Sequence, residues 1–289
     1  MKNTVLLSID VFNPNQTLLK YGVFTARNLG AKLLLFDAHF KTVVVSGDMV
    51  TSGSAAINVI DRTDKVEEAK RKLATIYKHL NEEWHHTRAK LVTDPVPAWQ
   101  GNKEMYLLEE IEKEKPLMIL AEVKSNFNLI NELFGTAETK LAEEAECPVL
   151  LVPEGVAYSE VTDIHYLLER EKPIEEVTRE VLFLKEMADN FANKSTINLL
   201  YYFGDDKEIA EQELALKKSV LLNELQYDKL VFLNMSDHDI ETAIHQNTKK
   251  YATDIFAFPS RDKSFIGRLI SKDNTKRLIL QSKIPVLVF

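Results

Sequence analysis

Short apolar runs alternate with longer amphipathic segments along the first half of the chain. The apolar runs are 4–10, 31–38, 88–94, 116–122 and 148–152. The segments between them, at about 14–29, 61–83, 103–114 and 136–146, space their apolar residues as on one helix face. Runs that are apolar throughout are typical of parallel strands buried on both faces. Five strands alternating with four helices therefore predict an α/β fold with helices on both sides of a parallel sheet.

The first helix carries recognisable end signals. Asn13 and Pro14 predict an N-cap followed by a proline in the first helical turn. Gly30 predicts the end of this helix, because glycine readily adopts the left-handed conformation that follows a helix. The apolar run 31–38 begins directly after that glycine, so the chain turns straight into its second strand.

The second half repeats the order of the first. Its expected strands are 163–169, 196–203, 228–234, 254–259 and 285–289, and its expected helices are 173–193, from 207 onward, 238–250 and 273–282. ECPVLLV (146–152) matches KIPVLVF (283–289), each ending its half with a proline-led apolar run. Residues 154–162 contain Gly and Ser and predict a linker. We therefore expect a duplicated unit, with domains at 1–153 and 163–289.

Composition narrows the classes of function. The 289 residues carry a formal net charge of −8, which argues against a nucleic-acid or anionic-membrane surface. The N-terminal run is interrupted by Asp10 and lacks the pattern of a signal peptide, and no apolar stretch is long enough to cross a bilayer. These features predict a cytoplasmic protein. Cys147 is the only cysteine, which excludes intrachain disulfides and a multi-cysteine zinc site.

Four features carry a resemblance to a known family. They are Asp10 after the first strand, the helix stop and second strand in NLGAKLLLFDA (28–38), the Gly135-Thr136 pair, and CPVLLV (147–152). Together they resemble the universal stress protein family in its tandem form. The resemblance implies two Rossmann-like domains, each with a five-stranded parallel sheet in the order 3-2-1-4-5. It also implies that the domains pair through their last strands as a pseudo-dimer, and a further homodimer is compatible with it.

The resemblance also implies a place for a nucleotide, ATP with Mg²⁺, in the first domain. Nucleotide-binding members use an Asp after strand one and a G-x2-G-x9-G-(S/T) loop after strand four. On this chain the Asp is Asp10 and the final pair is Gly135-Thr136, whereas Glu122 and Ser125 stand where the first two glycines would be. The candidate nucleotide-binding residues are Asp10, Ala38, Glu122, Ser125, Gly135 and Thr136, with Ala38 at the adenine pocket.

The missing glycines favour weak or lost nucleotide binding. A side chain at Glu122 would crowd the phosphates, and its charge would oppose them by about 1 to 4 kcal/mol at contact distance. Lys124 could offset this repulsion, and Mg²⁺ could reverse it. The alternative interpretation of Gly135-Thr136 is a turn followed by a helix cap.

In the second domain no residue of the nucleotide motif remains. Glu169 occupies the position equivalent to Asp10, and Pro259 and Asp262 occupy the positions of the first two glycines. Lys272-Asp273 occupies the position equivalent to Gly135-Thr136. The loop that spans these positions, residues 259–273, carries four cations that suit an anion: Arg261, Lys263, Arg268 and Lys272.

Other sites have weaker support from the sequence. His79, Glu83 and His86 are spaced to share a helix face and approach a metal ion, and the alternative is a solvated helix end. Dinucleotide and P-loop fingerprints are absent from the sequence.

The prediction for function is a non-enzymatic stress-response protein that acts through a protein partner, with weak or lost nucleotide binding. One alternative is an ATP- or AMP-sensing module with its site in the first domain. The other is a slow nucleotide hydrolase in which Glu122 positions water.

Overall fold

The computed structural model describes most of both halves of the chain. The described residues are 4–38, 63–83, 85, 87–92, 103–123, 145–170, 172–189, 194–203, 207–235, 240–259 and 284–289. The helices expected at 136–146 and 273–282 lie almost wholly outside these residues. Every other expected strand and helix has a counterpart in the structure.

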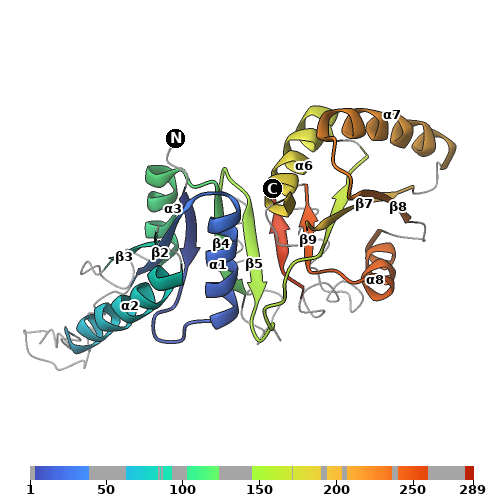
Figure 1. The fold of residues 1–289 in the computed structure, drawn as a ribbon. Coiled ribbons are helices and arrows are strands. Elements are labelled where there is room, and N and C mark those ends of the chain that lie inside the picture. Colours follow the sequence, from blue (N-terminus) through green and yellow to red (C-terminus); the bar gives the residue numbers. More distant parts are fainter. Residues whose placement is uncertain are drawn as a thin grey trace, which may run out of the picture.

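The strands in the described residues form one continuous ten-stranded sheet, in the order β3-β2-β1-β4-β5-β10-β9-β6-β7-β8 (Figure 1). The first half supplies β1 (Thr4–Ser8), β2 (Lys32–Ala38), β3 (Thr87–Val92), β4 (Met118–Val123) and β5 (Val149–Pro153). The second half supplies β6 (Asp163–Leu168), β7 (Thr196–Tyr202), β8 (Leu230–Met235), β9 (Ile255–Phe258) and β10 (Val286–Val288). From either edge to the centre of the sheet, the strands of each half follow the same order: third, second, first, fourth and fifth.

Pairing is parallel everywhere except at the centre of the sheet. There β5 and β10 run antiparallel, with Leu151 opposite Val286 and Val149 opposite Val288. Both strands are buried along their whole length. Pairing satisfies the backbone groups that two apolar edge strands would otherwise leave unpaired.

Helices cover both faces of the sheet. They are α1 (Gln16–Asn28), α2 (Thr63–Glu83), α3 (Lys103–Glu114), α6 (Ile174–Asp189), α7 (Lys207–Leu225) and α8 (Ile240–Lys250). Alternate strand residues point to opposite faces, so Val5 and Leu7 belong to the core layer that also contains residues of α1, α2, α6 and α7, whereas Leu6 belongs to the layer with residues of α3 and α8. The α/β class and the mostly parallel sheet are confirmed. The division into two domains stays a prediction.

The ends of α1 show how local sequence sets the helix. Asn15, rather than Asn13, is the N-cap, because its Oδ1 accepts hydrogen bonds from the N–H groups of Thr17 (2.9 Å) and Leu18 (3.1 Å). Gly30 has φ +58° and its N–H donates to the carbonyl of Arg27. The expected stop at Gly30 is confirmed, and the expected cap is wrong by two residues.

None of the helices within the described ranges combines the length and the apolar composition needed to cross a membrane.

Candidate functional site

The strand order reverses at β1, which lies between β2 and β4. The point of reversal lies beyond the carboxyl ends of β1 and β4. In open parallel sheets ligands bind at this place, since the diverging connections leave a crevice there. The second half has the same reversal at β6, which lies between β7 and β9. The chain therefore contains two candidate sites.

Asp10 follows β1 and closes a turn of its own backbone. Its Oδ1 accepts a 2.9 Å hydrogen bond from the N–H of Phe12, and its carbonyl accepts one from the N–H of Asn13. The side chain is half-buried. One carboxylate oxygen is thus used to hold the loop that leads into α1.

Glu122 on β4 is held by the cap of α1. The Nδ2 group of Asn15 donates a 2.7 Å hydrogen bond to Glu122 Oε1, while Asn15 Oδ1 caps the helix. Asn15 thus links the N-terminus of α1 to β4 across the carboxyl end of β1. The N–H groups at a helix N-terminus attract anions, and here the amide of Asn15 and the carboxylate of Glu122 lie beside them.

Asp37 near the end of β2 adds a third carboxylate to this edge. It is 1% exposed, and its Oδ2 accepts a 2.9 Å hydrogen bond from the N–H of Val11. Sequence reasoning missed both Asp37 and Asn15. The signal for Asp37 was available, because an acid inside an apolar strand needs a donor when it is buried. The partner of Asn15 could not be found from sequence.

The structure leaves part of the predicted site undescribed. Ala38 is the last residue of β2 and pairs with Val92, and nothing further is described of its side chain. Ser125, Gly135 and Thr136 lie outside the described residues. Asp10 and Glu122 are therefore the two predicted residues whose side chains the structure places at this edge. Within the described part of the chain no three His, Cys, Asp or Glu side chains are grouped as metal ligands.

The second site is crossed by side chains of its own chain. Lys172, in the loop after β6, donates from Nζ both to Glu180 Oε1 on α6 and to the carbonyl of Pro259 at the end of β9. The hydroxyl of Tyr166 donates a 2.6 Å hydrogen bond to the other carboxylate oxygen of Glu180. Because Pro259 stands at the first glycine position of the family loop, Lys172 connects the two chain segments that would border a ligand.

A second lysine holds the same loop from the neighbouring helix. Lys217 on α7 donates from Nζ to the carbonyls of Glu169 (2.7 Å), Arg170 (2.7 Å) and Lys172 (3.1 Å). Burial lowers the pKa of Lys217, although nearby carboxylates oppose that change. These three carbonyls take up the three donors of one ammonium group.

Burial also changes the pKa of the carboxyl group in this network, that of Glu180. It raises the pKa of Glu180, against the lowering effects of Lys172 and Tyr166. Burial and the charge of Glu180 raise the pKa of Tyr166 well above 10. The side chains of Lys172 and Glu180 are 10% and 13% exposed, so this ion pair has little contact with water.

Of the metal site suggested by the spacing of His79, Glu83 and His86, the structure describes one contact, between His79 and Glu83. His79 Nε2 lies 3.5 Å from Glu83 Oε1, and both side chains are largely exposed, at 67% and 47%. His86 lies outside the described residues. The pair has the spacing of an ordinary i,i+4 contact on a solvated helix.

Comparison with solved structures identifies the fold. A putative universal stress protein from Pseudomonas aeruginosa UCBPP-PA14 superposes with a TM-score of 0.65 at 15% identity, over 100% of this chain and 93% of that chain. A universal stress protein from Archaeoglobus fulgidus DSM 4304 gives a TM-score of 0.66 at 13% identity, over 99% and 96%. The chain has the universal stress protein fold.

The match extends through both halves of the sheet, because it covers nearly all of each compared chain. The same fold occurs in the cytoplasmic domain of a prokaryotic cation chloride cotransporter, with a TM-score of 0.57 and 12% identity over 100% of this chain and 95% of that one. Neither the family models nor the curated proteins that were compared with the chain give a match. The universal stress protein fold therefore rests on tertiary structure.

Proposed function

We propose that this chain is a non-enzymatic, cytoplasmic stress-response protein made of two universal stress units, with weak or lost nucleotide binding, that acts through a protein partner. The two units would be 1–153 and 163–289, joined by residues 154–162. Their pairing through β5 and β10 would form a pseudo-dimer inside one chain. The near-complete overlap with universal stress proteins supports this assignment.

The hydrogen bond between Asn15 and Glu122 is the main support for weak or lost nucleotide binding in the first unit. It spans the carboxyl ends of β1 and β4, where a nucleotide phosphate would meet the first glycine of the family loop. A phosphate there would have to displace this contact and lie beside the carboxylates of Glu122 and Asp10. Each pair of like charges at contact distance opposes binding by about 1 to 4 kcal/mol, depending on how strongly solvent screens it.

The second site supports the same conclusion by a different route. Lys172 bridges the loop after β6 to Pro259 after β9, and Lys217 takes up three carbonyls of that loop. These two cations are therefore engaged by the chain itself. Opening this site for a ligand would break several charge-assisted hydrogen bonds, which are the stronger class in proteins.

A thermal-shift titration tests the proposal. The wild type, Glu122→Gly and Asp10→Ala are heated with ATP and Mg²⁺, and separately with AMP. A ligand at about a hundred times its dissociation constant stabilises the folded state by about 2.7 kcal/mol, which raises Tm by several degrees for a unit of this size. We expect no shift in the wild type. Glu122→Gly removes both the carboxylate and its contact with Asn15, so any latent capacity should show as a shift in that variant.

Two outcomes would contradict the proposal. A wild-type shift that disappears in Asp10→Ala would make the first unit a nucleotide sensor. Phosphate release from ATP that stops in Glu122→Gln would make the chain a hydrolase, since the amide keeps the shape of the side chain and removes the base. Asp228→Ala is the matched control for loss of one surface carboxylate, because Asp228 is 73% exposed and precedes β8, the strand at the other edge of the sheet from the first site.

A further inference from the structure

The first helix of each half has a groove beside it, and among the described residues only the groove beside α1 is filled by another segment of the chain. α1 follows β1 and α6 follows β6, and both pack on the same face of the sheet. The prolines that precede them, Pro14 and Pro173, set a common register. In that register the buried residues Leu18 and Gly22 of α1 correspond to Val177 and Val181 of α6.

The linker fills the groove beside α1. The ring of Tyr158 stacks on Phe24 with centroids 4.9 Å apart and meets Tyr21 edge-on at 5.0 Å. The hydroxyl of Thr17 donates a 2.5 Å hydrogen bond to the carbonyl of Val156. An extended segment with one aromatic side chain thus lies along the helix.

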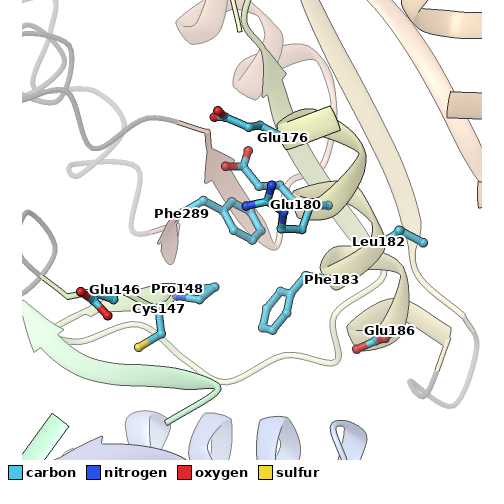
Figure 2. Close-up of a pocket in the computed structure, with 10 residues that line it drawn as sticks. Glu146, Cys147, Pro148, Glu176, Glu180, Leu182, Phe183, Glu186 and Phe289 are labelled. Carbon is cyan, nitrogen blue, oxygen red and sulfur yellow. The ribbon is translucent and has the colours of Figure 1, made fainter. Parts of the chain in front are cut away.

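The groove beside α6 is open. It has a volume of about 580 Å³ and lies between this helix, the start of β5 and the end of β10. Figure 2 shows Phe183 reaching from α6 into the space that separates the helix from Cys147 and Pro148. Phe183 corresponds to Phe24 in the common register. It meets Phe289 edge-on at 5.8 Å, and Phe289 also lines the groove.

The groove beside α6 has more acidic side chains than the groove beside α1, and this difference indicates the charge of a ligand. The linker that covers α1 carries Glu154 and Glu160, and Arg27 of α1 lies close enough to affect Tyr158. The position that corresponds to Arg27 on α6 is Glu186. Thr17 is likewise replaced by Glu176, which is exposed.

The rest of the lining is mostly acidic as well. Glu146 lines the groove from just before β5, and Glu180 lines it from α6, whereas Arg179 is the one cation among the lining residues that the structure describes. Glu180 already binds Lys172 and Tyr166. With Glu146, Glu176 and Glu186 also in the lining, the groove is acidic on balance, and an acidic lining favours a ligand of positive charge.

We propose that the groove beside α6 binds an extended, basic peptide segment of a partner protein, with one aromatic side chain stacked on Phe183. The segment would lie as residues 154–162 lie along α1, with lysine or arginine where the linker has glutamate. The inference uses the equivalence of the two halves and is independent of nucleotide binding, so a positive or negative nucleotide result leaves it unchanged.

Fluorescence anisotropy with a synthetic peptide tests this inference. The probe is a fluorescein-labelled peptide of residues 154–162 carrying Glu154→Lys and Glu160→Lys. We expect saturable binding to the full chain, at least about tenfold tighter than for the unmodified acidic peptide. Tyr158→Ala in the probe, or Phe183→Ala in the protein, should weaken binding by about tenfold or more, as is common for a central aromatic anchor.

A charge exchange keeps the test independent of folding. Glu176→Thr with Glu186→Arg gives α6 the side chains that α1 has at these positions, and both changes lie on exposed positions. This double variant should lose the preference for the basic probe and prefer the unmodified acidic peptide. Circular dichroism and thermal melting verify that each variant is folded.

Three results would overturn the inference. The first is absence of saturable binding by the basic probe at millimolar protein concentration. The second is binding that neither Phe183→Ala nor the charge exchange alters. The third is a dimer in sedimentation velocity that Glu186→Arg dissociates, because the occupant would then be a second copy of the chain.

Discussion

Lys172 provides the sharpest test of how the second site is closed. In Lys172→Met the carboxylate of Glu180 keeps only its hydrogen bond from Tyr166, and the carbonyl of Pro259 loses a donor. Removing one partner of a buried ion pair costs about 3 to 5 kcal/mol, because the other charge stays buried without compensation. With both side chains almost fully buried, we expect a loss of unfolding free energy in that range at pH 7.5.

The pH dependence of this loss follows from the pKa of Glu180. Burial raises that pKa above its usual value of 4.5 even in the wild type, and Lys172 lowers it. The variant therefore has a still higher pKa. A carboxyl group whose pKa is raised on folding favours the folded state at low pH and loses that contribution as pH rises through the folded pKa. The difference between variant and wild type should be largest at pH 7.5 and small at pH 4.5.

Urea unfolding followed by circular dichroism at these two pH values measures the effect. Lys194→Met is the matched control, because Lys194 is 51% exposed and its nearest carboxylate oxygen is 3.6 Å away. We expect that control to change stability by less than about 0.5 kcal/mol. In the double variant Lys172→Met with Glu180→Gln, much of the loss should be recovered.

A loss in Lys172→Met no larger than in the control would refute the argument. So would a double variant whose loss equals the sum of its single losses, since coupled partners are non-additive.

Two further predictions concern stability. Asp254→Ala should cost about 2 kcal/mol in urea unfolding, because the Asp254 carboxylate accepts from the N–H groups of Thr162 (2.7 Å) and Asp163 (3.0 Å) at the end of the linker. Asp254→Asn, which keeps one acceptor oxygen, should cost less, and equal costs would contradict this role. Burial lowers the pKa of His165 from 6.5, so its contribution to stability is present above pH 6.5 and is lost as pH falls through the folded value. His165→Gln should flatten the decline in unfolding free energy between pH 7 and 5, and an unchanged slope would assign the decline to other groups.

Local patterns predicted most of the elements because they depend on neighbours along the chain. The apolar run at 148–152 and its partner at 285–289 were predicted as the last strands of their halves, and they meet as β5 and β10. Gly30 ends α1 as expected because its φ of +58° suits glycine. Asn13 followed by Pro14 predicts a cap at Asn13 from residue types along the chain. Asn15 is also an asparagine, and only the direction of its side chain distinguishes the two.

The contacts that shape both sites depend on residues distant in sequence. Asn15 and Glu122 are 107 positions apart, and Lys172 and Pro259 are 87 apart. Sequence indicated that Glu122 and Pro259 replace glycines. The hydrogen bonds of Asn15 to Glu122 and of Lys172 to Pro259 could not be predicted from sequence. Such pairs form only after the sheet has brought the ends of separate strands together.

By itself the sequence determined the order of strands and helices, the repetition of that order and the lack of motif glycines, since these follow from periodicity and residue type. Only the tertiary structure decided that one helix groove is filled by the linker and that the other is open. Phe24 and Phe183 are the same residue type in the same local setting. What differs is whether a distant segment lies against each ring, and that depends on the path of the whole chain.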